Sequence, residues 1–237
     1  MPQAVAAPVE GFVRALKEVA GGQVSAVYAV GSLALDDFSH KQSNVDLVVV
    51  ADPRLNPAQR RSLRRQERSL RHAGRPAQVW HTTWEEISGG PDALAEPSEL
   101  ATPMTFTILR NDPMPLQGPD WPVAWTDDAR LRSWALDRLR MIAGGPHGLL
   151  VLRRAVTPFV LEAARLAHIA ITGRVLSKSE AGESVTNIVS SRHRRVVVDS
   201  GGYRNGAQTS MYWGPFERKY DALALVKDLL NAAGGAA

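Results

Sequence analysis

The chain has 237 residues, a net charge of +4 and 44% apolar residues, which is ordinary for a globular protein with a sizeable core. It contains no cysteine, which excludes disulfides and thiolate metal sites. The first residues lack a basic segment followed by a long apolar core, and no apolar run approaches the ~20 residues of a membrane span. We therefore expect a cytoplasmic protein with no membrane partner.

The first half of the chain has the apolar patterns of a small mixed sheet backed by helices. Helices are expected at residues 8–20 and 85–87 and over the arginine-rich residues 59–75, with Asn56-Pro57 as a good start for the last of these. Strands are expected at residues 24–30, 44–50, 77–82 and 105–109. The unbroken apolar run of the second strand is typical of a sheet interior. These elements predict an α/β domain over residues 1–112.

The second half has a different pattern. Residues 111–126 contain four prolines and one glycine, which is typical of a linker. Beyond it the apolar residues have helical spacing, and helices are expected at residues 129–142, 150–172, 178–189 and 215–232. Pro158 divides or kinks the second of these. We therefore predict an α+β chain whose all-helical domain covers 127–237, with a ligand site in the cleft between the domains.

The helix predicted over residues 59–75 is strongly basic. It contains Arg60, Arg61, Arg64, Arg65, Arg68, Arg71 and Arg75, against the single acid Glu67. One interpretation is a solvated helix with a narrow apolar side. The other is a docking surface for an acidic partner. Because no aromatic residues are interleaved, the pattern is weak evidence for nucleic acid.

The clearest chemical motif is a Gly-Ser turn followed by a strand that carries one acid. Gly31-Ser32 ends the first predicted strand, and Ser43-Asn44-Val45-Asp46 opens the second. Residues i and i+2 of a strand point to the same face. The pattern resembles the signature of the nucleotidyltransferase superfamily, in which the second strand carries Asp-x-Asp and a neighbouring strand carries a third acid.

The resemblance implies transfer of a nucleoside monophosphate from a nucleoside triphosphate to a hydroxyl, with Mg²⁺ stabilising the charge that develops. The implied catalytic positions are Asp46, Asn44 and Gln78, and the implied phosphate-binding positions are Gly31, Ser32 and Ser43. Asp46 is the implied Mg²⁺ ligand. Amides bring no charge and accept no proton as a base, so two of three expected acids are missing. The plainer alternative is that Gly-Ser is only a turn and that Asp46 caps something local.

Residues 164–183 resemble the helical-domain motif of aminoglycoside 3''-adenylyltransferases, and the likeness continues more loosely through 192–204. In that family an Arg on this helix and a Lys just past the Thr-Gly turn contact the nucleotide phosphates. Arg165 and Lys178 match them with the same spacing, and Tyr203 lies one residue from the family's nucleotide-contacting Tyr. The alternative is a helical hairpin with exposed basic residues. The resemblance implies bound ATP and a polar small-molecule acceptor, classically an aminoglycoside.

Three interpretations of the two amides remain open. The chain is an active adenylyltransferase with one Mg²⁺ held by Asp46 and the triphosphate, or a fold reused to bind a nucleotide or small molecule without transfer. Alternatively Asn44 and Gln78 are isosteric replacements of the kind made to trap a substrate complex. His81 could replace the missing base, although a strand histidine is more often structural. No acceptor pocket is singled out by the acids Glu85, Glu86, Glu96, Glu99, Asp127, Asp128 and Asp137.

Overall fold

The structure, a computed structural model, describes residues 1–71, 77–92, 94, 98–122, 125, 127–186 and 189–235. The chain divides into two compact units, Met1–Thr126 and Asp127–Ala237. The first unit contains a four-stranded mixed sheet with helices, and the described part of the second is helical apart from its connections. The predicted α+β fold, a mixed sheet followed by a helical region, is confirmed.

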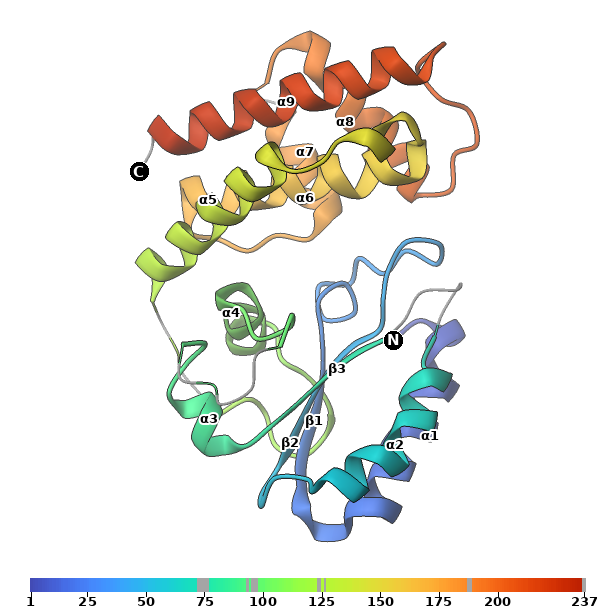
Figure 1. Cartoon of the computed structure of the whole chain (residues 1–237), viewed down its shortest axis with the longest axis vertical. Helices are drawn as coiled ribbons and strands as arrows, with labels where there is room; N and C mark the ends of the chain where they lie inside the picture. The colour runs from blue at the N-terminus through green and yellow to red at the C-terminus, as the bar shows by residue number, and fades with distance from the viewer. Residues whose placement is uncertain are drawn as a thin grey trace. The chain divides into compact units, whose positions relative to one another are not determined.

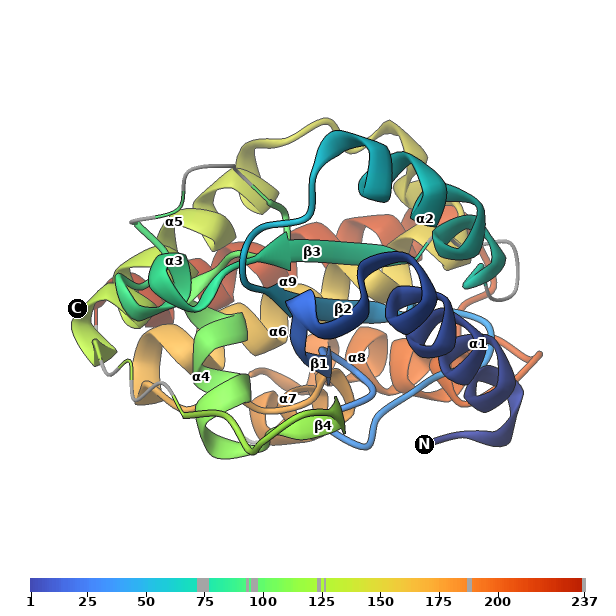
Figure 2. The ribbon, with the colours of Figure 1, turned by 90° about the horizontal axis from the view of Figure 1, so that it is seen from below.

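The sheet of the first unit has the strand order β3-β2-β1-β4, which Figure 2 shows. Its strands are β1 (Val24–Val30), β2 (Asp46–Ala51), β3 (Gln78–Thr82) and β4 (Met114–Gln117). β1 is antiparallel to both β2 and β4, whereas β2 and β3 are parallel. The register places Asp46 opposite Val30 on one side and opposite Gln78 on the other. One end of β2 therefore brings three strands together.

Helices α1 (Gln3–Ala20) and α2 (Pro57–Ser69) cover one face of the sheet (Figure 1). This core contains Phe12, Leu16, Leu63, Val27, Leu47 and Val49. α2 begins where the sequence predicts, because Asn56 forms a capping box with Gln59 and a proline occupies the first turn. α1 begins five residues before its predicted start and continues through Pro8.

Helices α3 (Trp84–Ser88) and α4 (Pro103–Asn111) belong to the opposite face. Its core contains Tyr28, Val48, Trp80, Ile87, Phe106 and Leu109. The strand predicted at 105–109 is wrong, since these residues lie in α4. Their β-branched side chains favour a strand, but Thr102 caps the helix by accepting a hydrogen bond from the Thr105 amide at 3.2 Å. Pro103 then stands at the first helical position, where it needs no amide donor.

Part of the predicted linker 111–126 belongs to the sheet. Residues 114–117 form β4, which pairs with β1 at the sheet edge, where Pro115 is tolerated. Gly118 follows with φ +91°, and a Cβ there would lie 2.5 Å from the Ser25 carbonyl oxygen. The Tyr28 hydroxyl donates to the Pro119 carbonyl at 2.8 Å. The proline and glycine residues therefore mark a tightly packed edge strand and turn.

The helical unit is built around α6, which packs against each of the other four helices. Its helices are α5 (Asp128–Gly144), α6 (Arg153–Thr172), α7 (Lys178–Val185), α8 (Ser191–Arg204) and α9 (Pro215–Gly235). A short 3₁₀ turn at Gly148–Val151 lies between α5 and α6. Another, at Gly21–Gln23, follows α1 in the first unit. Pro158 lies inside α6 without dividing it, and α8 had no counterpart among the expected helices.

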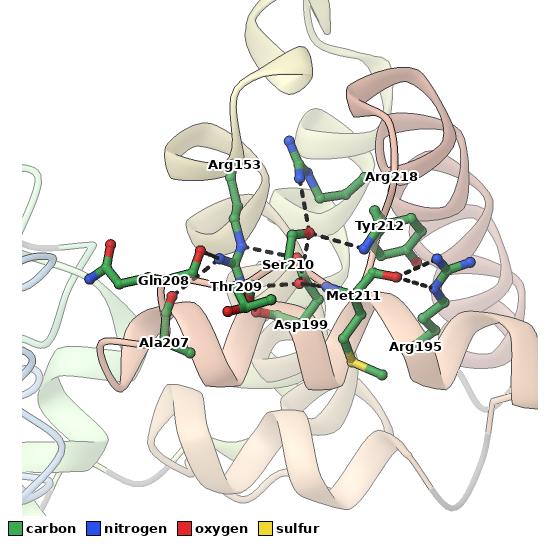
Figure 3. Close-up of polar contacts among 10 residues, drawn as sticks. All are labelled: Arg153, Arg195, Asp199, Ala207, Gln208, Thr209, Ser210, Met211, Tyr212 and Arg218. Atoms are coloured by element: carbon green, nitrogen blue, oxygen red, sulfur yellow. Dashed lines mark hydrogen bonds and ion pairs between the residues drawn. The ribbon is translucent and has the colours of Figure 1, made fainter.

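By length and composition alone α6 is apolar enough to cross a membrane, although the sequence showed no unbroken apolar run. Within the helical unit 61% of its apolar window is buried, as in the core helix of a globular domain. Arg153, a charged residue of α6, is paired with an acid on another helix. In Figure 3 the guanidinium of Arg153 lies beside the carboxylate of Asp199 on α8.

Arg153 and Asp199 together fix the connection between α8 and α9 (Figure 3). The Arg153 guanidinium donates to Asp199 and to three backbone carbonyls of residues 207–209. The buried Asp199 carboxylate also accepts from the Ser210 hydroxyl at 3.0 Å and the Met211 amide at 2.8 Å. A charged pair with this many hydrogen bonds satisfies the polar backbone of a loop that has no regular structure.

Candidate active site

Asp46 and Gln78 lie on the same face of the sheet. They are directly paired in the parallel β2–β3 register, and paired residues of neighbouring strands project to the same side. Val45 belongs to the core cluster of the opposite face, so the alternation extends one residue before β2. Asn44 therefore belongs to the face of Asp46. The predicted catalytic positions share one face at one end of β2.

Gly31 lies against the carboxylate of Asp46. Its φ is +63°, and a Cβ at this position would come within 2.8 Å of Asp46 Oδ2. The turn is closed by hydrogen bonds from the Leu35 amide to the Gly31 carbonyl at 3.1 Å and from the Asp37 amide to the Ser32 carbonyl at 2.9 Å. Only glycine fits both the backbone conformation and the close approach. The Gly-Ser turn and the strand acid thus form one structural unit.

Ser43 has a local partner. Its buried hydroxyl accepts from the Ser39 amide at 2.9 Å, and its own amide donates to the Ser39 carbonyl at 2.9 Å. These two bonds close the loop that precedes β2. The contacts explain Ser43 as a loop-closing residue, and its proposed contact with phosphate stays a prediction.

Gln78 is hydrogen bonded to an acid that sequence reasoning did not connect with it. Its Nε2 donates to Oε2 of Glu99 at 2.8 Å. Glu99 is an exposed residue in the turn before α4, 21 positions further along the chain. The sequence named Glu99 only as one of several scattered acids. No spacing rule joins a strand residue to a turn at this distance, so only the folded chain could pair them.

His81 does not replace the missing base on this face. It pairs in register with Val49, whose side chain belongs to the core beneath α1 and α2. Its Nε2 lies 2.9 Å from Oε1 of Glu67 on α2. His168 on α6 is half-buried, with burial first and the Arg174 charge second lowering its pKa. Both histidines are explained by packing within their own units.

In the helical unit, Arg165 and Lys178 are held by one carboxylate. Oε2 of Glu162 lies 2.6 Å from Nη2 of Arg165 and 3.1 Å from Nζ of Lys178. Arg165 and Glu162 are one turn apart on α6. Lys178 opens α7, whose start is fixed by a capping box between Ser177 and Glu180. The structure therefore brings together the two cations that the sequence assigned to phosphate binding.

The electrostatics of this cluster are strongly perturbed. Burial alone would raise the pKa of Glu162, but the charges of Arg165 and Lys178 lower it to about 2. Burial lowers the pKa of Lys178, and the positive charges of Arg165 and Arg204 act in the same direction against the attraction of Glu162. Two cations therefore share one carboxylate, and the charge of Arg204 adds to the positive potential at Lys178. This positive potential suits an anionic group such as phosphate.

Tyr203 packs against an arginine of the helical unit. The Arg153 guanidinium lies over its ring, 4.8 Å from the ring centroid. Tyr203 therefore packs against the arginine that forms the ion pair with Asp199. The next residue, the buried Arg204, contributes to the positive potential at Lys178. A nucleotide contact of Tyr203 remains a prediction. Arg204 could have been found only by knowing how α8 packs on α6.

The chain was compared with known protein families, sequences and solved structures, and the solved structures show a protein of similar fold. No family model and no curated protein sequence matches the chain. A solved structure does match, the crystal structure of spectinomycin adenyltransferase AAD(9) from Enterococcus faecialis with ATP and spectinomycin. The two structures align with a TM-score of 0.69 over 96% of this chain and 98% of that one, at 14% sequence identity. The chain has a nucleotidyltransferase fold.

The nucleotidyltransferase fold raises the question of which residues could hold a metal ion. Among the described residues no group of three or more His, Asp and Glu side chains is placed to bind one. Mg²⁺, however, is often held by only one or two carboxylates together with the phosphates of its substrate. The carboxylate of Asp46 and the amide oxygen available at Asn44 fit one such ion, not a pair. The missing acid therefore lowers the number of ions that these residues could hold, without excluding a single ion.

The basic helix α2 of this nucleotidyltransferase fold borders two shallow hollows. One, of about 320 Å³, is lined by Arg60, Arg61, Arg64, Glu67, His81 and Pro57. The other, of about 380 Å³, is lined by Arg64, Glu67, Arg68, Arg71 and Ala77. Arg75 and Glu96 lie outside the described residues. Binding of an acidic partner along α2 stays a prediction.

Proposed function

We propose that the protein transfers AMP from ATP to a hydroxyl of a polar small molecule. The observation that carries the proposal is the placement of Asp46 at the end of β2, against the glycine of a Gly-Ser turn. This arrangement occurs in a fold shared with an adenyltransferase that was crystallised with ATP and spectinomycin. The likeness supports an aminoglycoside-like acceptor. A cytoplasmic location is part of the proposal.

Each unit, taken by itself, carries groups suited to binding phosphate. In the first unit Asp46 would hold Mg²⁺ with help from Asn44, and Gly31 and Ser32 offer backbone amides and a hydroxyl to phosphate oxygens. The bound ion would supply positive charge to the phosphates and to the leaving pyrophosphate. In the second unit Arg165 and Lys178 would attract phosphate by charge, because the cluster around Glu162 retains an excess of positive charge.

The experiment is pyrophosphate release from Mg²⁺-ATP, first with spectinomycin and then with a panel of aminoglycosides. We expect release that requires both the metal and an acceptor. Asp46→Asn should reduce the rate by roughly 10³-fold or more, because it removes the metal carboxylate without changing shape. Asp137→Asn, which alters an exposed acid on α5, is the matched control and should release pyrophosphate at the unmodified rate.

The second candidate function is nucleotide binding without transfer. It is favoured by the amides Asn44 and Gln78, which stand where the fold's resemblance implies acids. Calorimetry with ATP would then show affinity that Lys178→Met weakens, yet no acceptor would elicit pyrophosphate. The restored variant Asn44→Asp/Gln78→Glu separates the cases further. Release that appears only after restoration would indicate a site that is intact apart from its acids.

A further inference from the structure

The hydrogen bond between Gln78 and Glu99 places a carboxylate beside the strand position where an acid is missing. Gln78 is paired directly with Asp46 in the sheet, and its amide nitrogen lies 2.8 Å from Glu99 Oε2. The carboxylate is therefore one hydrogen bond away from position 78, on the face that carries Asp46. The residue that the sequence presents as a loss is bonded to an acid from elsewhere in the chain.

Glu99 is held in place by the turn that carries it. The next residue, Leu100, is buried in the core formed by β1, β2, β3, α3 and α4. The Ala101 amide donates to the Ser98 carbonyl at 3.0 Å, and the Leu100 amide donates to the Ser98 hydroxyl at 3.3 Å. The side chain of Glu99 remains exposed while its backbone is anchored on both sides. A carboxylate whose backbone is held in place and whose side chain is exposed can reach a substrate.

An amide at position 78 is the suitable partner for this acid. The NH₂ group of glutamine donates to a carboxylate, whereas a glutamate at position 78 would set a like charge against Glu99. The observed bond uses one carboxylate oxygen and leaves Oε1 of Glu99 able to accept a proton. The NH₂ group also disfavours a cation at the shared oxygen. Gln78 therefore orients Glu99 for proton chemistry more readily than for metal binding.

The neighbouring acids of the first unit are already engaged. Glu86 accepts from Arg54 and from the hydroxyl of Thr82 at 3.0 Å, and its pKa is lowered by these partners against the effect of burial. Glu67 is bonded to His81 on the opposite face. Asp46 is the proposed ligand of the metal. Among these four acids, Glu99 is thus the one that lies beside the strand end and is open to a proton donor.

We propose that Glu99 is the general base of the transfer reaction, oriented by Gln78. The inference rests on the proposed function. The acceptor hydroxyl gives its proton to Glu99 as its oxygen forms a bond to the α-phosphorus of ATP. The bond from that phosphorus to the bridging oxygen of the β-phosphate breaks, and pyrophosphate leaves with the electron pair. The number of protons and charges is conserved, and no further reactant is needed.

The test compares initial rates of pyrophosphate release from Mg²⁺-ATP and spectinomycin, or the best acceptor of the panel. The variants are Glu99→Gln, Glu99→Ala, Gln78→Glu and the double change Glu99→Gln/Gln78→Glu. Glu85→Gln, an exposed acid on α3, is the matched control. Because Glu99 is exposed, these changes should leave thermal unfolding as it is in the unmodified protein. ATP affinity is measured in parallel by calorimetry.

We expect Glu99→Gln to lower kcat by about 10²- to 10⁴-fold with ATP affinity unchanged, as for removal of a general base. Added formate should restore part of the activity of Glu99→Ala, since it supplies a carboxylate in the space left free. Gln78→Glu should restore activity in the Glu99→Gln background. A kcat for Glu99→Gln within threefold of the control, while Asp46→Asn is inactive, overturns the role of Glu99 alone. No release from the unmodified protein or from any variant overturns the proposed function and this inference with it.

Discussion

The carboxylate of Glu162 should stabilise the helical unit in a way that disappears in acid. Glu162→Gln keeps the shape and removes the charge that holds Arg165 and Lys178. Although burial opposes ionisation, the two cations lower the pKa of Glu162 from 4.5 to about 2. A shift of this size corresponds to about 3 kcal/mol of stability near pH 7, at about 1.4 kcal/mol per pKa unit.

The sign of the pH dependence follows from the lowered pKa. The unfolded chain takes up a proton on Glu162 near its ordinary pKa of 4.5, whereas the folded chain does so only near 2. The stabilisation is therefore complete above about pH 5 and is lost as pH falls towards 2. At pH 3 roughly half of it should remain. The difference between the unmodified protein and Glu162→Gln should shrink by roughly half between pH 7 and pH 3.

The assay is urea unfolding followed by circular dichroism at both pH values. Amide hydrogen exchange of peptides from α6 and α7 locates the effect, and about a hundredfold faster exchange is expected in Glu162→Gln at pH 7. Asp137→Asn is the matched control, because Asp137 forms an exposed pair with Arg140 at the same three-residue spacing. A Glu162→Gln difference no larger than that of the control, or one that does not shrink in acid, would refute the electrostatic argument.

Three further predictions test other parts of the chain. Gly31→Ala should destabilise the first unit by about 1–3 kcal/mol, because its φ is +63° and a Cβ would meet the strand-end carboxylate, whereas Gly22→Ala should have no such effect in thermal unfolding. Asp199→Asn should cost about 3–5 kcal/mol in urea unfolding, since it removes the buried carboxylate that pairs with the partly buried Arg153. Burial, with the charge of a neighbouring aspartate, raises the pKa of Tyr28 to about 12. The absorbance change of its ionisation at 295 nm should appear near that pH and be absent in Tyr28→Phe. Because the folded-state pKa is raised, stability is lost as pH rises from 10 towards 12. At neutral pH, Tyr28→Phe should cost about 1 kcal/mol, since it removes the hydrogen bond to Pro119.

Local signals in the sequence predicted most of the secondary structure. The strand at 24–30 was placed with its observed ends and the strand at 77–82 to within one residue, because apolar runs bounded by polar residues have few other solutions. The prediction of a strand at 105–109 was wrong because the preference of β-branched residues for strands depends on side-chain packing as well as on backbone conformation. The cap at Thr102 and the following proline were the stronger signal there.

The candidate site divides in the same way. Gly31 and Asp46 were recognised because a positive-φ turn and a strand-end acid leave a mark in the local sequence. The partnership of Arg165 and Lys178 could be expected from their spacing, but Glu162, which binds both, was not singled out. The contact between Gln78 and Glu99 left no local trace at all.

What the sequence determined by itself was most of the helices and strands, the glycine beside the strand acid, and the loss of charge at positions 44 and 78. Apolar periodicity, caps and backbone conformation are local properties, so they can be read from neighbouring residues. The tertiary structure alone decided which charges meet, because an exposed acid in a turn or a glutamate on a long helix acquires a partner only when distant segments pack together. The chemical meaning of Gln78 changed for this reason: beside Glu99, the amide is a hydrogen-bond donor to a carboxylate.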